Sequence, residues 1–473
     1  MEKNQVSVIK IEKLGMNGEG VARANNEVVF VPFALPNEQV KCKCINAKNK
    51  FAIMKVEEII SSSPDREAPP CPYFKKCGGC DIQHLIYNKQ LEFKTNLVKE
   101  TLLKVGNIDY DVEPCEFSKN QYNYRNKASF PIVLDDGYKI GMYRVNSHNL
   151  VDIDYCYLQK DDINKVLRIT KQWLNSVYSS ITQNINDTES YYQDNTLFKS
   201  SRKDIVNKNF INDTKSQYGR LKHLVIRNID DKLLITLVAT NDNIFKIDEY
   251  IDLLKENFSD FGLNININTK DNNVILSNKY THIYGNKDLS FVSDEIKLKI
   301  TNASFYQVND YIKDKIYEDV KNAVKDDVVI DAFSGAGLLT AKLSTKAKKV
   351  YGIEIVEDAV KSANQLMKDN NINNVQNICG DCTKELPKLI ENIKGQVSVV
   401  LDPPRKGCDR KVLESLLKCK PNKIIYIACS PISLSRDAKI LVESGLYKIT
   451  KVKPYDMFPQ TKNVETLMIL EKI

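Results

Sequence analysis

Residues 301–473 alternate short apolar runs with stretches of helical periodicity. The runs include VVIDAF from residue 328, KVYGIEIV from 349, VSVVLDPP from 397 and KIIYIACS from 423. Alternation of strands with helices predicts a parallel, doubly wound sheet that is covered on both faces. The two final runs, YKITKVKPYD and ETLMILEKI, leave no room for a helix between them. They therefore predict an antiparallel hairpin at one edge of this sheet.

Glycines and acids stand where these strands end. The first strand runs into Gly335 and Gly337, whose missing side chains allow a ligand to approach the backbone. The next three strands end in Glu354, Asp381 and Asp402. Open α/β sheets bind ligands at this carboxyl edge, and an acid after the second strand can accept both ribose hydroxyls of a nucleoside. The pattern predicts a nucleoside cofactor site, although a plain α/β domain with solvated acids is the alternative.

This combination of a glycine turn and acids at the strand ends resembles the class I S-adenosylmethionine (SAM) methyltransferases. The resemblance implies a Rossmann-like seven-stranded sheet. A sulfonium cofactor needs no phosphate cradle, and the chain has no P-loop lysine here. The residues that carry the resemblance are Asp331, Gly335, Gly337, Glu354, Asp381 and Asp402.

Two cysteines follow the fourth and fifth strands, Cys408 in DPPRKGC and Cys429 in YIACSP. A strand-end thiolate at Cys429 could add to C6 of a pyrimidine and make C5 nucleophilic toward a methyl donor. The C5 proton must then leave to a general base. Glu465, which starts the final strand, is the candidate. A cytosine-5-methyltransferase that uses Cys408 remains an alternative.

The chain resembles the RNA uracil-5-methyltransferase family over essentially its full length. The resemblance implies Cys429 as nucleophile, Glu465 as base and Phe305 as an aromatic wall against which the flipped uracil stacks. One departure is Asn463, where the family usually has His before Val-Glu. The SAM contacts that the resemblance implies are Gln307, Phe333, Glu354 and Asp402, with Asp381 near the adenine.

Three cysteines stand in CPYFKKCGGC: Cys71, Cys77 and Cys80. A triad with one distant partner suits a [4Fe–4S] cluster better than zinc, which usually takes two close cysteine pairs. Spacing leaves Cys115 and Cys156 both open as the fourth ligand. The resemblance to the ribosomal-RNA members of the family implies Cys156, and a structural role for the cluster.

The N-terminal segment holds short β-favouring runs broken by Gly and Pro, which predicts a small β-barrel. GEGVARANNEVVFVPFALPNEQV resembles the TRAM domain, an RNA-binding module of the ribosomal-RNA members. Arg125 and Lys127 lie among tyrosines in QYNYRNKASF, a mixture that suits RNA binding or an ordinary β-surface. Residues 180–218 are polar and predict a mobile insertion. We expect a barrel over 1–62, a central α+β iron–sulfur domain over 63–300 and the methyltransferase domain over 301–473.

Composition sets wider limits. The chain has 473 residues, of which 42% are hydrophobic, and its N-terminus lacks the apolar stretch of a signal peptide. No apolar run is long enough for a membrane helix, so we expect a cytoplasmic protein without membrane contact. We also expect a monomer. A net charge of +7 permits a polyanionic partner without demanding one. The leading hypothesis is methylation of uridine C5 in 23S rRNA; alternatives are a tRNA substrate and a non-catalytic Fe–S protein that binds RNA.

Overall fold

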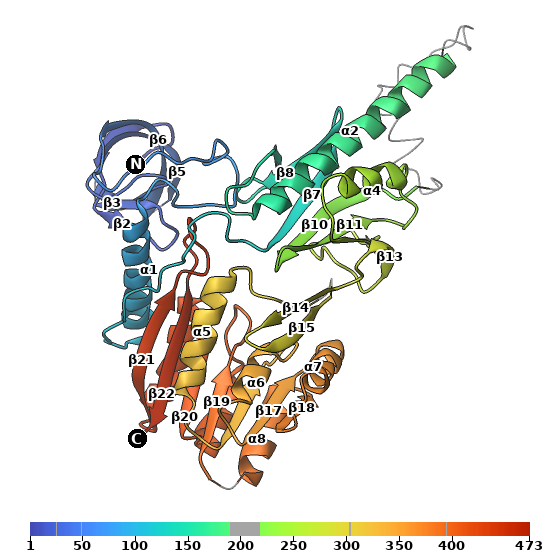
Figure 1. Cartoon of the computed structure of the whole chain (residues 1–473). Helices are drawn as coiled ribbons and strands as arrows, with labels where there is room; N and C mark the ends of the chain where they lie inside the picture. The colour runs from blue at the N-terminus through green and yellow to red at the C-terminus, as the bar shows by residue number, and fades with distance from the viewer. Residues whose placement is uncertain (25, 49, 190–217, 302–303, 394) are drawn as a thin grey trace.

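A computed structural model describes the whole chain except residues 25, 49, 190–217, 302–303 and 394, and the side chains of 181–189. The N-terminal part rolls six short strands into a small barrel (Figure 1). Its interior holds Ile9, Val29, Cys42 and Met54, because alternate residues of each strand point inward. In the sheet order β1-β5-β6-β4-β3-β2, the strands are β1 (Val6–Lys10), β5 (Gln39–Lys48), β6 (Phe51–Ser61), β4 (Glu27–Val31), β3 (Gly20–Ala24) and β2 (Lys13–Leu14).

A long helix joins the barrel to the C-terminal part of the chain. Helix α1 (Tyr87–Thr101) continues into one π-helical turn, η1 (Leu102–Gly106). It packs beside β21 (Tyr447–Tyr455) and α10 (Pro431–Glu443), which are more than 300 residues away in the sequence (Figure 1). A helix from the N-terminal part of the chain therefore packs against the last strands of the C-terminal part.

The central part is a seven-stranded, mostly antiparallel sheet with helices α2 (Asp161–Glu189) and α4 (Ile247–Lys255) packed on its main core (Figure 1). Trp173 of α2 stacks on Tyr250 of α4 with ring centroids 4.5 Å apart. The predicted insertion at 180–218 begins as a continuation of α2, and residues 190–217 lie outside the described residues. The strands, in sheet order, are β13 (Tyr280–Gly285), β12 (Phe261–Ile267), β11 (Lys232–Ala239), β10 (Leu221–Ile229), β7 (Lys127–Leu134), β8 (Tyr138–Tyr143) and β9 (Leu150–Asp152).

The C-terminal sheet has the predicted Rossmann-like architecture of seven strands with helices on both faces. The predicted terminal hairpin is present, with β22 inserted between β20 and β21. Its order is β18 (Val375–Cys379), β17 (Lys349–Glu354), β16 (Val328–Ala332), β19 (Val397–Leu401), β20 (Lys423–Ala428), β22 (Glu465–Lys472) and β21. The helices are α5 (Asp310–Ala323), α6 (Leu338–Leu343), α7 (Glu357–Asp369), α8 (Cys382–Asn392), α9 (Arg410–Cys419) and α10.

A separate hairpin, β14 (Leu289–Ser293) and β15 (Ile296–Ile300), lies between the central sheet and helices α6 and α7 (Figure 1). Its inward residues Leu289, Phe291 and Leu298 pack with Leu366 and Met367 of α7. Among the described residues, no helix combines the length and the apolar character needed to cross a membrane.

Candidate active site

The turn after β16 is built for close approach of a ligand. Phe333, Gly335 and Gly337 all have positive φ, at 69°, 54° and 84°. A Cβ on Gly335 would meet open space, whereas one on Gly337 would lie 2.8 Å from the Cβ of Ala363 on α7. Gly335 therefore leaves room beside the turn, and Gly337 lets α6 and α7 pack closely.

Glu354, at the end of β17, holds this turn in place. Its Oε2 accepts a hydrogen bond from the backbone N–H of Gly335 at 3.0 Å, and its Oε1 accepts one from Val356 at 2.8 Å. Asp381 caps α8 by accepting a hydrogen bond from the N–H of Thr383 at 2.9 Å. That bond lowers the pKa of Asp381. Both carboxylates stand at the carboxyl edge of the sheet, as predicted, and both are already bonded to backbone.

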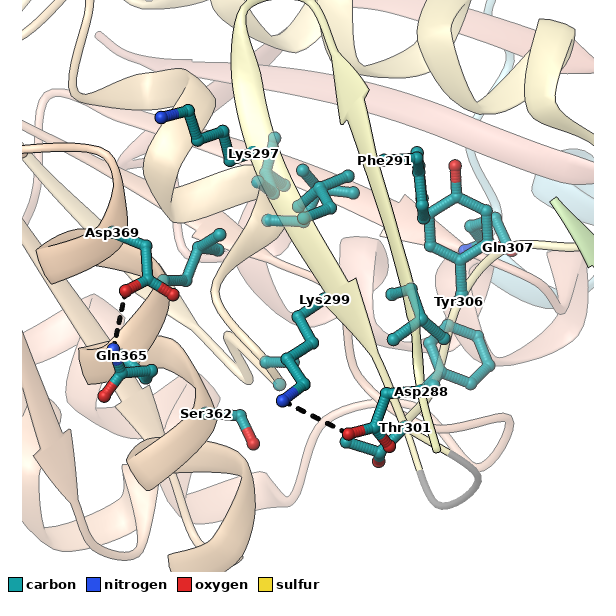
Figure 2. Close-up of a pocket in the computed structure, with 18 of the residues that line it drawn as sticks. Asp288, Phe291, Lys297, Lys299, Thr301, Tyr306, Gln307, Ser362, Gln365 and Asp369 are labelled. Carbon is teal, nitrogen blue, oxygen red and sulfur yellow. Dashed lines mark hydrogen bonds and ion pairs between the residues drawn. The ribbon is translucent and has the colours of Figure 1, made fainter. Parts of the chain in front are cut away.

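A cavity of about 1180 Å³ opens above this edge, between the β14–β15 hairpin and helices α6 and α7 (Figure 2). Six of the residues singled out from the sequence line it: Phe305, Gln307, Asp331, Phe333, Gly335 and Asp402. Phe305 is 76% exposed, so its ring is available to a partner from outside. The backbone oxygen of Gln307 accepts a hydrogen bond from Asn126 at 2.9 Å, which fixes this segment to the central part of the chain.

Two acids, the buried Asp331 and the half-buried Asp402, form the floor of the cavity. Asp331 is 1% exposed and accepts a hydrogen bond from Thr340 at 2.5 Å. Burial raises the pKa of Asp331 and of Asp402 to about 7. Charged carboxylates are costly in such a place unless a positive partner is present. The floor is therefore suited to a cationic ligand.

The predicted nucleophile and base come together across two neighbouring strands. Ala428, the last residue of β20, pairs with Thr466 of β22 in the antiparallel register. Cys429 follows Ala428 and Glu465 precedes Thr466, so the two side chains belong to the same end of the strand pair. Cys429 is half-buried and Glu465 is buried.

The electrostatics link these two groups with Asp402. Burial raises the pKa of Cys429 to about 11, and the charges of Glu465 and Asp402 contribute. Burial also raises the pKa of Glu465 to about 8, again with a contribution from Asp402. Arg405 acts in the opposite sense and lowers the pKa of both groups. Sequence reasoning missed Arg405, although it stands three residues after Asp402 in DPPRKGC.

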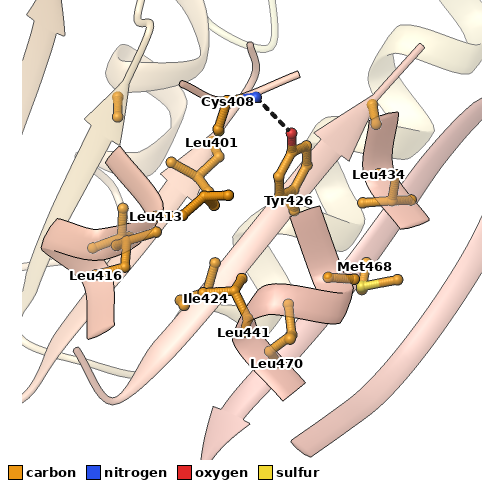
Figure 3. Close-up of a cluster of buried hydrophobic side chains, with 14 of the residues drawn as sticks. Leu401, Cys408, Leu413, Leu416, Ile424, Tyr426, Leu434, Leu441, Met468 and Leu470 are labelled. Carbon is orange, nitrogen blue, oxygen red and sulfur yellow. Dashed lines mark hydrogen bonds between the residues drawn. The ribbon is translucent and has the colours of Figure 1, made fainter. Parts of the chain in front are cut away.

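Cys408, the competing nucleophile, lies in a hydrophobic core (Figure 3). It is 6% exposed among Leu401, Leu413 and Tyr426, and burial raises the pKa of its thiol to about 12. Its backbone N–H donates to Asp437 at 2.8 Å and to the hydroxyl of Tyr426 at 3.3 Å. This environment is typical of a structural cysteine rather than a reactive one.

Four of the predicted metal ligands, Cys71, Cys77, Cys80 and Cys156, line one smaller cavity of about 190 Å³. Burial raises the pKa of all four thiols. The N–H of Gly79 donates to Sγ of Cys77 at 3.3 Å. Among the described residues, however, no group of three or more His, Cys, Asp or Glu side chains forms a metal-holding arrangement. The donor set fits a group bound by several thiolates, and the predicted cluster stays a prediction.

Two other residues take unexpected places. Arg125 and Lys127, considered above as RNA contacts, line the cysteine cavity. Burial, with the positive charges of Arg227 and Arg125 nearby, lowers the pKa of Lys127 to about 8.

Cys115, the other candidate for the fourth metal ligand, is buried in the core under β21 and α1, away from this cavity.

Comparison with known proteins decides the family. The family model described as tRNA (uracil-5-)-methyltransferase matches residues 212–473, and the TRAM domain model matches residues 2–55. The chain belongs to the RNA uracil-5-methyltransferase family. It is therefore a SAM-dependent methyltransferase that acts on RNA.

Relatives extend this family membership over the whole chain. An uncharacterized RNA methyltransferase of Clostridium tetani is 36% identical over 99% of this chain and 97% of the relative. One from Staphylococcus epidermidis is 33% identical over 99% and 98%. Among solved structures, a Pyrococcus abyssi tRNA (uracil-54, C5)-methyltransferase in complex with S-adenosyl-L-homocysteine matches with a TM-score of 0.71 at 21% identity. The match covers 98% of this chain and all of that one, which supports the same fold throughout.

Proposed function

We propose that this methyltransferase methylates C5 of a uridine in 23S rRNA, with Cys429 as nucleophile and Glu465 as base. The observation that carries the proposal is the pairing of Ala428 with Thr466, which brings a half-buried thiol and a buried carboxyl group to one end of the β20–β22 pair. Asp402, on the floor of the adjacent large cavity, influences the pKa of both.

In the proposed reaction, Cys429 loses its proton to solvent and its Sγ bonds to uracil C6, which places negative charge on C5 and O4. Bound SAM supplies the methyl group as a sulfonium. Glu465 then takes the C5 proton, the electron pair returns to the C5–C6 bond, and Sγ leaves C6. Arg405 favours both active forms, because it lowers the pKa of the thiol and of the carboxyl group.

We assign the SAM contacts to Gln307, Phe333, Glu354, Asp381 and Asp402. The floor acids suit the positive sulfonium, and Glu354 stands where acids bind ribose in such sheets. Phe305, exposed at the cavity, is the proposed surface for stacking of the flipped uracil. Removal of one contact, Glu354→Ala, should weaken SAM binding measured by calorimetry; unchanged affinity would contradict the assignment.

The four cysteines that share a cavity are the proposed ligands of a [4Fe–4S] cluster. Supporting this are the four sulfurs around one space and the N–H groups of Gly79 and Gln83 that donate to Cys77 and Cys80. Bound there, such a cluster would order the cysteine loop. Anaerobic purification followed by iron and sulfide analysis tests it: about four irons per chain are expected, and zinc in their place would refute it.

A tRNA substrate is the second candidate, because a tRNA methyltransferase shares the fold of this chain from end to end, the barrel included. The barrel therefore does not separate the two substrates. Methylation of in-vitro transcripts of 23S rRNA and of tRNA with labelled SAM distinguishes them, since label in tRNA alone would refute the rRNA proposal. Domain limits of 1–62, 63–300 and 301–473, a monomeric state and a cytoplasmic location complete the proposal.

A further inference from the structure

The loop 456–464 joins β21 to β22 and ends at Glu465. A segment from the other end of the chain holds this loop. The backbone N–H groups of Asp81 and Ile82 both donate to the carbonyl oxygen of Gln460, at 3.1 and 3.2 Å. The N–H of Lys462 donates to the carboxylate of Asp81 at 3.2 Å. The conformation of the loop therefore depends on where residues 81 and 82 lie.

Gln90 of α1 completes this contact. Its side chain is fully buried. Its Oε1 accepts the backbone N–H of Gln460 at 3.0 Å, and its Nε2 lies 2.9 Å from Oε1 of the same residue. The same Nε2 lies 2.8 Å from the carbonyl oxygen of Leu85 and 3.3 Å from that of Ile82. One amide thus joins the loop to the segment that follows the cysteines.

That segment begins at the cysteine cavity. Cys80 directly precedes Asp81, and Nε2 of Gln83 donates to Sγ of Cys80 at 3.1 Å. Gln460 itself has φ of +70°, a left-handed conformation that a residue with a side chain adopts only under constraint. The constraint comes from the bonds to Gln90, Asp81 and Ile82.

We infer that Gln90 is a positioning residue for Glu465, and that it ties the placement of this base to the order of the cysteine loop. The inference rests on the proposed function. Cys429 follows β20 and is not part of the loop 456–464, whereas Glu465 is the residue at which the loop enters β22. Loss of Gln90 should therefore impair proton abstraction from C5 much more than formation of the bond between sulfur and C6.

The test separates these two steps. A 23S rRNA or tRNA transcript containing 5-fluorouridine traps the covalent adduct without the base step, while turnover of the ordinary transcript needs that step. Gln90→Leu should trap within about twofold of the wild-type rate but turn over at least tenfold more slowly, with adduct accumulating on the ordinary transcript. Equal losses in both assays, or no loss, would overturn the inference.

The matched control is Thr101→Val, which removes a hydroxyl of a buried residue of the same helix; among the described residues, this hydroxyl bonds only to the carbonyl oxygen of Leu97. Both assays should stay at wild-type rates. Glu465→Gln tests the underlying function separately. If that variant turns over normally, the role of Glu465 fails; if it accumulates adduct and Gln90→Leu does not, only the inference about Gln90 fails.

Amide hydrogen exchange gives a readout that does not depend on activity. Exchange at Gln460 and Lys462 should become at least tenfold faster in Gln90→Leu and in protein depleted of iron by chelation, because their acceptors are lost or displaced. If Gln90→Leu does not fold, exchange is measured instead in Asp81→Ala, which removes the carboxylate that accepts the N–H of Lys462. Unchanged exchange at Lys462 in Asp81→Ala and at both positions after iron depletion would refute the coupling.

Discussion

Asp402 raises the pKa of Glu465, so the acid at the end of β19 and the acid at the start of β22 share one electrostatic site. Glu465 is buried and Asp402 is half-buried, and each has a raised pKa, about 7 for Asp402 and about 8 for Glu465. Two carboxyl groups in such a place resist simultaneous ionisation. Binding of a cation at this site should favour the ionised form of these two carboxyl groups.

The raised pKa of Glu465 makes folding stability depend on pH. The native state holds this proton up to about pH 8, whereas the unfolded chain releases it near its ordinary value of 4.5. Stability is therefore lost as pH rises between these two values. Glu465→Gln should remove this loss and stabilise the protein by roughly 4 kcal/mol at pH 8 but hardly at pH 4.5. Urea unfolding at both pH values measures it; equal stability changes would contradict the buried environment of Glu465.

The same pKa predicts the pH dependence of the reaction. If Glu465 must be ionised to accept the proton and Cys429 must be a thiolate, kcat/KM should rise steeply with pH up to about 8 and then less steeply toward a plateau above about 11. Asp402→Asn removes a negative charge that raises this pKa, so the rising limb should move to lower pH, although weaker SAM binding reduces the plateau. A limb that stays in place would show that Asp402 does not act on the base.

The two strand-end cysteines should respond differently to replacement. Cys429→Ala removes the proposed nucleophile, and methyl transfer should fall by about a thousandfold or more. Cys408→Ala removes a core thiol that touches neither cavity, so its cost should be roughly 1 kcal/mol of stability with near-normal methylation. Labelled SAM and a 5-fluorouridine transcript provide the assay. Loss of activity only in Cys408→Ala would transfer the role of nucleophile to that residue.

Two glycines of one turn form a matched pair. Gly335→Ala meets open space and carries only the cost of positive φ, roughly 1 kcal/mol. Gly337→Ala adds a contact of 2.8 Å with the Cβ of Ala363, so α6 and α7 must separate and the cost should reach roughly 3 kcal/mol. Thermal unfolding of both variants measures the difference. Equal melting temperatures would show that α7 moves away freely.

Positions along strands could be predicted from the sequence because their periodicity is local. The runs ending at Glu354 and Asp402 indicated the ligand-binding edge of the sheet. The sequence predicted the closing hairpin but not that β22 lies beside β20, which brings Cys429 and Glu465 to one end of a strand pair. Contacts between distant segments could not be predicted. Gln90 and Gln460 are 370 residues apart, and neither stands in a recognisable motif.

The direction in which side chains point also could not be predicted from the sequence. Arg125 and Lys127 stand in QYNYRNKASF, a mixture of basic and aromatic residues that suits an RNA-binding surface, yet both line the cysteine cavity. Residues 91–105, LEFKTNLVKETLLKV, have helical periodicity, but this periodicity shows neither that α1 begins at Tyr87 nor that it ends in a π-helical turn. The reason is that both depend on packing against α10 and β21, which sequence periodicity does not report.

Lys94 and Asp456 form a fully buried ion pair between α1 and the loop that leads to Glu465. Tyr87 donates to the same carboxylate at 2.8 Å, and Lys94 also donates to the carbonyl oxygen of Phe458 at 3.0 Å. Lys94→Met would leave the charge of Asp456 buried without its partner, which should cost roughly 3–5 kcal/mol. Adding Asp456→Asn removes that charge and keeps an acceptor for Tyr87, so the double variant should be more stable than Lys94→Met alone. Urea unfolding of the two single variants and the double variant gives the coupling directly, and purely additive losses would mean that the pair contributes no specific interaction.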